Sequence, residues 1–284
     1  MSTPLKKMSQ FVNVLATGIA TLSLDELRGS SVHGVLLQLG GTSFTRAHID
    51  AITLTIGGKA IIPGISGADM QDINDYEGLS NDAGFLMLWF GDPTLEGMRG
   101  EHVGDLDLDY YDQASAVLEV SIAGATAPTL AAYAILAPAK SRMGFQYSDL
   151  EVATVRSFVR TIVTPAAAVT KQSYPISLGS QAGARVRKIA MFNANLTSAE
   201  FKKNGVPIHD DIPNAVNSFV QEEFARVPQS GLYMLDHVVD GHLPKADSTV
   251  DSTGRAFPMQ VNITTSAADT LRVYADIHTP LQLL

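Results

Sequence analysis

The chain repeats part of its own sequence, and the repeat at its end constrains the fold more than any other feature. The stretch AVLEVSIAGATAPTLAAYAI, residues 116–135, returns as FPMQVNITTSAADTLRVYADI at residues 257–277. Apolar and polar residues alternate in both copies, and this alternation is typical of a β-strand with one buried face. The apolar positions correspond at one offset of 141: Leu118 with Met259, Val120 with Val261, and Ile122 with Ile263. Two strands and their connecting loop are therefore present twice.

The segments before this pair also correspond, at offsets of 147 or 154. The matched pairs are 11–18 with 158–165, 21–24 with 174–178, 32–41 with 186–195, 52–61 with 198–208, and the strands that begin at Gly84 and Gly231. The larger offset predicts an inserted loop in the second copy, and residues 165–172 have the composition of a loop. Residues 137–151 are the predicted joint between the two halves.

Turns and helices repeat as well. Gly57-Gly58 and Asn204-Gly205 are strong hairpin signals because both pairs accept a positive φ. A short helix is predicted after each hairpin, from apolar residues at helical spacing. These residues are Met70, Ile73 and Tyr76 in the first half, and Val216, Phe219, Val220 and Phe224 in the second.

Each half thus contains seven or eight short strands, one helix and turns rich in Gly, Pro, Asn and Asp. Such a pattern predicts an all-β protein of two tandem eight-stranded jelly rolls, a double jelly roll, with short helices in loops. We place the first roll, with an N-terminal arm, at residues 1–150 and the second at residues 151–284. The long segments 91–112 and 240–254 differ most between the halves and are predicted surface loops.

Composition limits the functions that fit. Charged residues make up 17% of the chain, against about 25% in an average domain. This fits a surface that is partly covered by copies of the chain or by a partner, and it fits a large sandwich with a weakly charged surface equally well. The net charge of −9 argues against direct nucleic-acid binding, which needs basic patches. The chain has no cysteine, and this fits a reducing cytoplasm. No stretch approaches the ~20 apolar residues of a membrane span.

The N-terminus could contact a lipid surface. Lys6 and Lys7 precede the apolar run 11–15, and basic residues beside apolar ones can rest on an anionic membrane. Because residues 11–15 have a counterpart in the second half, we interpret them as a first strand, which leaves the leading ten residues for such a contact. The run is too short for an export signal.

Three aspartates could bind a cation. In DLDLDYYD, a strand would place Asp105, Asp107 and Asp109 on one face. Calcium prefers oxygen ligands and would relieve the repulsion among three carboxylates. However, no EF-hand spacing is present, and an acidic edge facing solvent also keeps sheets from associating. Both interpretations stay open, with the acidic edge preferred, so no metal-binding, cofactor-binding or catalytic residue is assigned.

The histidines give no metal motif. His33, His48, His102, His209, His237, His242 and His278 show neither HExxH nor another ligand spacing. The densest group of ligand types is His237 and His242 with Asp236 and Asp240, where a solvated turn is preferred over a metal site. The nucleophile motif GxSxG and the phosphate loop ending GK[ST] are both missing.

The duplicated order of segments resembles the double jelly-roll major capsid proteins of icosahedral viruses. The small corticovirus type, from a marine bacteriophage with an internal membrane, is most similar; it is related in architecture to tectivirus coat proteins and adenovirus hexon. The likeness covers residues 11–277 and rests on the strand, NG or GG turn, strand and helix units at 52–76 and 198–224, the joint before VRSFVRTIV, and the two closing strand pairs.

This resemblance implies a structural function without catalysis. Three chains would form a homotrimer of pseudo-hexagonal outline, and trimers would tile the shell of the virion together with penton and minor capsid proteins. Assembly would take place in the host cytoplasm, with the N-terminus near an internal membrane. Coats of this type are also associated with calcium.

Two alternatives have different functions. A two-domain β-sandwich could bind carbohydrate or a receptor, as a viral spike does, although the single tryptophan, Trp89, lies in the apolar run LMLWF, where core packing is expected. A double-sandwich hydrolase would need acidic residues such as Asp236 or Asp240 for its activity.

Overall fold

The computed structural model describes residues 4–111, 115–140, 149–165, 167–176 and 184–280. The chain divides into two compact units. The first comprises residues 1–74, 79–158 and 278–284, and the second comprises residues 75–78 and 159–277.

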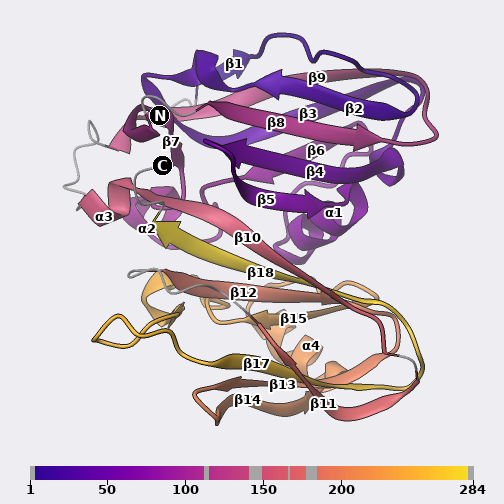
Figure 1. Ribbon diagram of the computed structural model, residues 1–284, viewed down its shortest axis with the longest axis vertical. Coiled ribbons are helices and arrows are strands. Elements are labelled where there is room, and N and C mark those ends of the chain that lie inside the picture. Colours follow the sequence, from indigo (N-terminus) through magenta and orange to yellow (C-terminus); the bar gives the residue numbers. More distant parts are fainter. Residues whose placement is uncertain (1–3, 112–114, 141–148, 166, 177–183, 281–284) are drawn as a thin grey trace. The chain divides into compact units, whose positions relative to one another are not determined.

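The first unit is built from two antiparallel sheets (Figure 1). One sheet has the order β1 (Leu5–Lys7), β9 (Thr126–Pro138), β3 (Ser30–Ser43) and β6 (Phe85–Trp89), with the short β7 (Leu106–Asp107) paired to β3. The other has the order β2 (Gly18–Ser23), β8 (Ala116–Ile122), β4 (Ile49–Ile56) and β5 (Lys59–Ile65). Successive strands mostly alternate between the sheets, which is the connectivity of a jelly roll.

The second pair of sheets repeats this order strand for strand. One sheet runs β10 (Thr154–Val163), β18 (Leu271–Pro280), β12 (Arg185–Phe192) and β15 (Leu232–Asp236), with the short β16 (Asp247–Ser248) paired to β12. The other runs β11 (Val169–Pro175), β17 (Met259–Thr265), β13 (Leu196–Lys203) and β14 (Val206–Pro213). The predicted all-β fold of two jelly rolls is confirmed.

The closing strands have the structure that their alternation predicts. Leu118, Val120 and Ile122 of β8 are buried, whereas Glu119 and Ser121 between them are half-buried. In each roll the last two strands lie in different sheets, since β8 pairs with β4 and β9 with β3, just as β17 pairs with β13 and β18 with β12. The repeated loop therefore carries the chain from one sheet to the other.

Both predicted hairpins form. The φ angles are 53° and 83° at Gly57 and Gly58, and 53° and 78° at Asn204 and Gly205. Two consecutive positive φ angles define the tight turn that suits the twist of a two-stranded hairpin. These turns connect β4 to β5 and β13 to β14.

A helix follows each hairpin, as predicted. These helices are α1 (Gly67–Tyr76) and α4 (Asn214–Glu223). The side-chain amide of Asn74 donates to the carbonyl oxygen of Met87 at 2.9 Å, and the amide of Gln221 donates to that of Met234 at 2.7 Å. Donors and acceptors correspond at the offset of 147, so the repeat extends to individual hydrogen bonds. The structure also describes the short helices α2 (Met98–His102) and α3 (Asp149–Val152) and 3-10 turns at 25–27, 46–48, 108–111 and 243–245.

The predicted first strand was wrong. Residues 11–17 contain one isolated bridge, from Val12 to Thr21, and Asn13 has a φ of 60° that interrupts an extended strand. The edge strand is instead β1, which pairs with β9 through Leu5 and Ile135. Part of the leading segment is therefore fixed in a sheet. No helix among the described residues is long and apolar enough to cross a membrane.

Two predicted loops contain more structure than expected. Within 165–172, residues from Val169 onward belong to β11, an edge strand whose polar side chains face solvent and hide the alternation. Within 91–112, α2, β7 and a 3-10 turn form, and Leu106 and Leu108 are fully buried. The centre of that segment is therefore not a surface loop. Residue 112, and residues 141–148 of the predicted joint, lie outside the described part.

Candidate functional site

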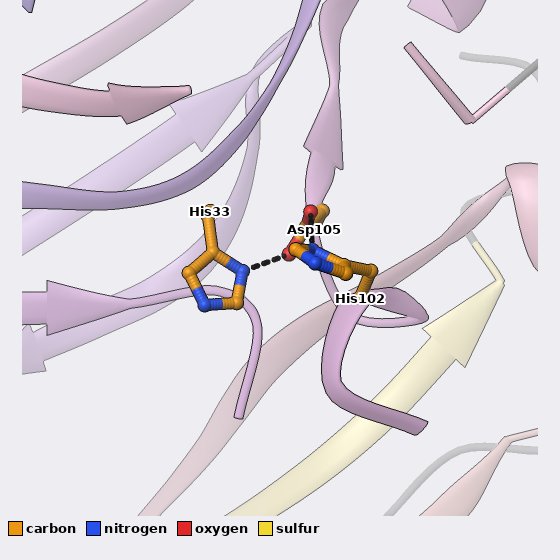
Figure 2. Close-up of side chains that lie close together, drawn as sticks. All are labelled: His33, His102 and Asp105. Carbon is orange, nitrogen blue, oxygen red and sulfur yellow. Dashed lines mark hydrogen bonds and ion pairs between the residues drawn. The ribbon is translucent and has the colours of Figure 1, made fainter. Parts of the chain in front are cut away.

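Two histidines and an aspartate meet inside the first unit. His33 lies on β3, His102 ends α2, and Asp105 directly precedes Leu106 of β7. The Nδ1 atom of His33 is 2.7 Å from one carboxylate oxygen of Asp105, and the Nδ1 atom of His102 is 2.8 Å from the other (Figure 2). One ligand atom from each residue lies within 4.8 Å of the other two.

The backbone holds these side chains in place. The carbonyl oxygen of His33 accepts hydrogen bonds from the N–H groups of Phe90 and Gly91, at 2.9 and 3.0 Å. The N–H of Asp105 donates to the carbonyl oxygen of His102 at 3.1 Å. A Cβ atom on Gly91 would lie 2.2 Å from the His33 Nδ1 and 2.4 Å from an Asp105 oxygen. Only glycine at position 91 therefore lets the imidazole and the carboxylate meet here.

The carboxylate of Asp105 is fully buried but remains ionised. Burial raises the pKa of Asp105, yet the hydrogen bonds from His102 and His33 outweigh burial, so its pKa lies below the ordinary value. The bond to Asp105 in turn raises the pKa of His102. The two imidazoles thus stabilise a negative charge that would otherwise be costly in the protein interior.

A buried lysine lies close to this group. The ammonium of Lys140 donates to the carbonyl oxygens of Val103, Thr154 and Glu151, at 2.7, 2.5 and 3.3 Å. Burial lowers the pKa of Lys140 to about 8, although Asp105 and Asp107 oppose this shift. The backbone N–H of Lys140 also donates to Asp107 at 2.9 Å.

The three aspartates of DLDLDYYD do not share a site. Asp105 bonds the two imidazoles, Asp107 accepts from the N–H of Lys140, and Asp109 accepts from the N–H of Gly29 at 2.7 Å. The strand ends after Asp107, and the chain turns into a 3-10 helix at Leu108. Asp105 and Asp107 are buried, so the predicted acidic edge facing solvent was wrong. Because each carboxylate has a different partner, the three aspartates do not come together as the calcium site that the sequence left open.

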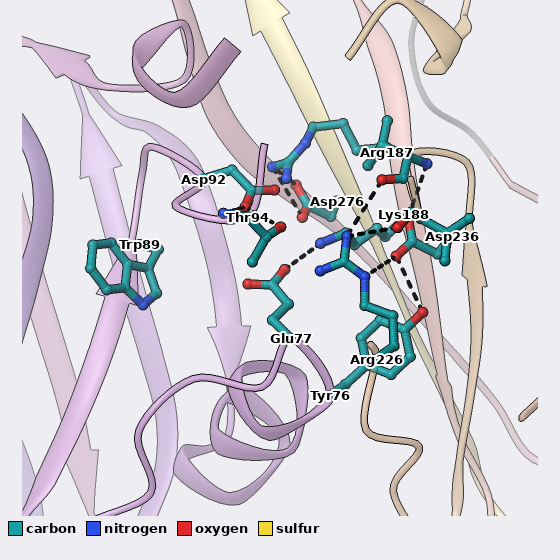
Figure 3. Close-up of polar contacts among 12 residues, drawn as sticks. Tyr76, Glu77, Trp89, Asp92, Thr94, Arg187, Lys188, Arg226, Asp236 and Asp276 are labelled. Atoms are coloured by element: carbon teal, nitrogen blue, oxygen red, sulfur yellow. Dashed lines mark hydrogen bonds and ion pairs between the residues drawn. The ribbon is translucent and has the colours of Figure 1, made fainter. Parts of the chain in front are cut away.

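The second unit contains a buried network of charges. Lys188 lies 2.5 Å from Glu77, Arg187 lies 3.2 Å from Asp276, and Arg226 lies 3.5 Å from Asp236. The hydroxyl of Tyr76 donates to Asp236 at 3.2 Å (Figure 3). Each buried cation thus has a carboxylate partner, which is what charges in a protein interior require.

The group of Asp236, His237, Asp240 and His242 does not converge. Asp236 bonds Arg226 and Tyr76, whereas His237 lies 3.1 Å from Asp247. Asp240 pairs with Lys245. Within the described residues, the only group of at least three histidine, aspartate or glutamate side chains whose ligand atoms approach this closely is His33, His102 and Asp105.

Sequence reasoning missed this trio because His33 and Asp105 lie 72 residues apart. A weak signal is present in the chain. His33 interrupts an apolar strand beside Val32, and Asp105 follows His102 by three residues. Neither observation indicates that the two segments pair.

The comparisons with known proteins identify the family. Residues 5–143 match the viral coat protein P2 N-terminal domain, and residues 155–281 match the viral coat protein P2 C-terminal domain. The chain belongs to the viral coat protein P2 family. No curated protein matches the sequence.

Solved structures show the same fold. The major capsid protein P2 from bacteriophage PM2 is 15% identical, with a TM-score of 0.79, and the match covers 99% of this chain and 98% of that one. A chain of Sulfolobus Turreted Icosahedral Virus is 12% identical, with a TM-score of 0.64 over 99% and 92%. A PBCV-1 virus capsid chain is 13% identical, with a TM-score of 0.61 over 97% and 94%.

This viral coat protein thus has the double jelly-roll fold of the solved capsid proteins, and it is a component of the virion. The resemblance that the sequence predicted is confirmed, and so is the predicted function in a capsid.

Proposed function

We propose that this coat protein forms homotrimers of pseudo-hexagonal outline that tile an icosahedral shell. Each chain has two jelly rolls with the same strand order, so three chains supply six similar units. A ring of six such units has a near-sixfold outline although the symmetry is threefold. Neighbouring trimers, penton proteins and minor capsid proteins would complete the shell.

The observation that best supports the trimer is a set of exposed apolar side chains on α4. In α1, Ile73 is 2% exposed, whereas its repeat counterpart Val220 in α4 is 48% exposed. Phe219 is 63% exposed. Val216 and Phe224, at helical spacing from these two residues, are also exposed, and so are Val227 and, on β14, Val206 and Ile208. Exposed apolar side chains that gather on one helix are typical of an interface.

A second copy of the chain is the partner that the repeat favours. The same helix position is buried in the first roll and uncovered in the second, and obligate interfaces between copies are apolar. The low charge of the chain supports the same interpretation. We define the α4 face as Val216, Phe219, Val220 and Phe224.

A charge on this face tests the trimer. Wild-type protein should have three times the chain mass of 30.3 kDa in native mass spectrometry and light scattering. Phe219→Glu places a carboxylate in the interface, and we expect the concentration for half-assembly to rise more than about tenfold, since ~1.4 kcal/mol corresponds to one such factor. Because Phe219 is exposed in the single chain, the fold should be retained.

The matched control is Ile19→Glu, which changes an exposed apolar residue of β2. This variant should assemble like the wild type. A wild-type chain that stays monomeric across the concentration range would reject the trimer and favour the two-domain binding module. Equal effects of the two variants would reject the α4 face as the interface.

The proposed function is structural rather than catalytic. Asp236 and Asp240, which a hydrolase between two sandwiches would use, each bond a cationic side chain. The net charge of −9 supports a shell that does not hold the genome directly. A chain without cysteine also suits assembly in the host cytoplasm.

The N-terminal segment is the part that we propose to face an internal membrane. Leu5, Val12 and Leu15 are each more than half exposed, and Lys7 is exposed beside them. Apolar side chains next to basic ones suit an anionic lipid surface. Pairing of β1 with β9 keeps Leu5 and Lys7 in place.

Vesicle flotation tests this contact. The full-length protein should float with vesicles that contain anionic phospholipid and less with neutral ones. Leu5→Ser with Leu15→Ser should reduce the bound fraction several-fold, because each change removes about 2 kcal/mol of apolar burial. Ile162→Ser, at an exposed position of β10, is the control. Unchanged flotation of the double variant would contradict the contact.

A further inference from the structure

We propose that His33, His102 and Asp105 bind a divalent transition-metal ion of the zinc class. This inference does not depend on the trimer or on the membrane contact, because all three residues belong to the first unit. It also differs from calcium binding by the three aspartates, since two of the three ligands are nitrogen atoms.

The distances suit an ion. The two Nδ1 atoms lie 2.7 and 2.8 Å from the carboxylate oxygens of Asp105, and all three ligand atoms fit within 4.8 Å. Ligands that share a zinc ion at ~2.0–2.1 Å stand slightly more than 3 Å apart, so small side-chain rotations would admit the metal. The ion would replace the two hydrogen atoms that the imidazoles donate to Asp105. A ring that carries two protons would release the Nδ1 proton to solvent, and a neutral ring would carry its proton on Nε2 instead.

The ligand types select the metal. Two neutral imidazoles and one carboxylate suit zinc, cobalt, nickel and copper. Calcium prefers six to eight oxygen ligands, which this group does not supply. The His33 and His102 rings lie 4.7 Å apart between centroids, so both can reach one ion.

The charge around the group also favours a cation. Asp105 and Asp107 are buried carboxylates, whereas Glu101, beside His33, is partly exposed. Lys140 is the ammonium whose charge acts on the two aspartates, and Arg156 is a second buried cation, whose backbone N–H donates to Gly104. The three carboxylates outnumber the two cations, so a divalent ion would add positive charge next to a buried carboxylate that water cannot screen.

The carboxylate of Glu101 lies near the second ring nitrogen of His33. A Glu101 oxygen lies 3.8 Å from the Nε2 atom of His33, on the other side of the ring from Asp105. Histidines that bind a metal through one nitrogen usually donate the other N–H to a carboxylate or carbonyl, which fixes the orientation of the ring. Glu101 would be this positioning residue once Nδ1 holds the ion.

The single tryptophan provides a direct test. The Trp89 ring lies edge-on to the His33 ring, with centroids 5.3 Å apart. Cobalt(II) bound at His33 should therefore quench the fluorescence of the full-length protein, saturating at one ion per chain. Zinc should reverse the quenching by competition, and calcium should not. Elemental analysis after dialysis against zinc should give one zinc per chain.

Variants locate the ion. His102→Gln keeps a hydrogen-bonding group beside Asp105 and should weaken cobalt binding at least tenfold. His242→Gln removes an exposed histidine elsewhere and should bind like the wild type. Zinc should raise the melting temperature of the wild type and of His242→Gln, but not that of His102→Gln.

Several results would overturn the proposal. Wild-type protein that retains no zinc and shows no saturable quenching would leave the three residues as a hydrogen-bonded group only. Equal cobalt affinity in His102→Gln and the wild type would place the ion elsewhere. If His102→Gln fails to fold, the wild-type stoichiometry and the competition between zinc and calcium still decide.

Discussion

At the scale of single residues, the polar groups were the hardest to predict. Alternation assigned Asp105, Asp107 and Asp109 to one face because it assumed a continuous strand. The strand is two residues long, so the three carboxylates point to different partners. The approach of His33 to Asp105 depends on the pairing of β3 with β7, which brings Ser31 opposite Asp107. No local pattern could show a contact that long-range pairing creates.

His209 should make the stability of the second unit depend on pH. Its Nε2 lies 2.8 Å from the hydroxyl oxygen of Tyr233, and that hydroxyl donates to the carbonyl oxygen of Ile212 at 2.8 Å. Burial, together with the nearby His237, lowers the pKa of His209 to about 4. The ordinary value is ~6.5, so the unfolded chain binds a proton that the folded chain resists. The stabilisation is complete above pH 6.5 and is lost as the pH falls towards 4.

His209→Gln should therefore reduce the loss of stability between pH 6.5 and 4. Urea unfolding midpoints at several pH values in this window, followed by circular dichroism, measure the effect. His242→Gln, at an exposed site, should leave the slope unchanged. The interpretation fails if His209→Gln and the wild type lose stability in parallel across this window.

At the scale of strands and helices, short sequence patterns predicted the elements whose structure depends on backbone conformation. Paired residues with positive φ fixed both hairpins, and helical spacing located α1 and α4. The N-terminal strand was displaced because Phe11 and Phe158 match in sequence although the chain bends at Asn13. β11 was missed because an exposed edge strand buries no face and therefore shows no alternation.

The orientation of α4 shows a limit of periodicity. The apolar residues have helical spacing, yet Asn217 and Gln221 face inward, where both amides donate to the carbonyl oxygen of Met234 at 2.8 and 2.7 Å. A carbonyl in the middle of β15 thus determines which side of the helix is buried. Spacing alone identifies an amphipathic helix but does not say whether the sheet or another molecule covers its apolar side.

At the scale of the whole molecule, the duplication predicted two jelly rolls, and each has the expected strand order. The sequence did not show that residues 75–78, from the first half of the chain, belong to the second unit. Glu77 in this segment lies 2.5 Å from Lys188 of β12, and both side chains are buried. Two distant parts of the chain therefore contribute to one core. The predicted boundary between residues 150 and 151 stays a prediction.

Replacing only one residue of the Glu77 and Lys188 pair should destabilise the protein, whereas replacing both with apolar residues should not. Glu77→Gln removes the charge beside Lys188, whose pKa burial already lowers. Removing one partner of a buried ion pair costs about 3–5 kcal/mol. Because Asp236 still acts on Lys188, the free energy of unfolding should fall by an amount near the lower end of that range. Lys188→Met should be similarly destabilising because it leaves the Glu77 carboxylate buried. Urea unfolding followed by circular dichroism measures both.

The double variant Glu77→Met with Lys188→Met should recover most of the loss, since an apolar pair of similar volume often replaces a buried ion pair at little cost. Lys245→Met removes the more exposed partner of the Lys245 and Asp240 pair and should change the free energy of unfolding by less than about 1 kcal/mol. If the double variant is as unstable as the sum of the single ones, the two charges do not act as a pair. Residues 75–78 would then stabilise the second unit through packing. The stability of this unit would depend on the apolar contacts of the repeated strands more than on the buried ion pair.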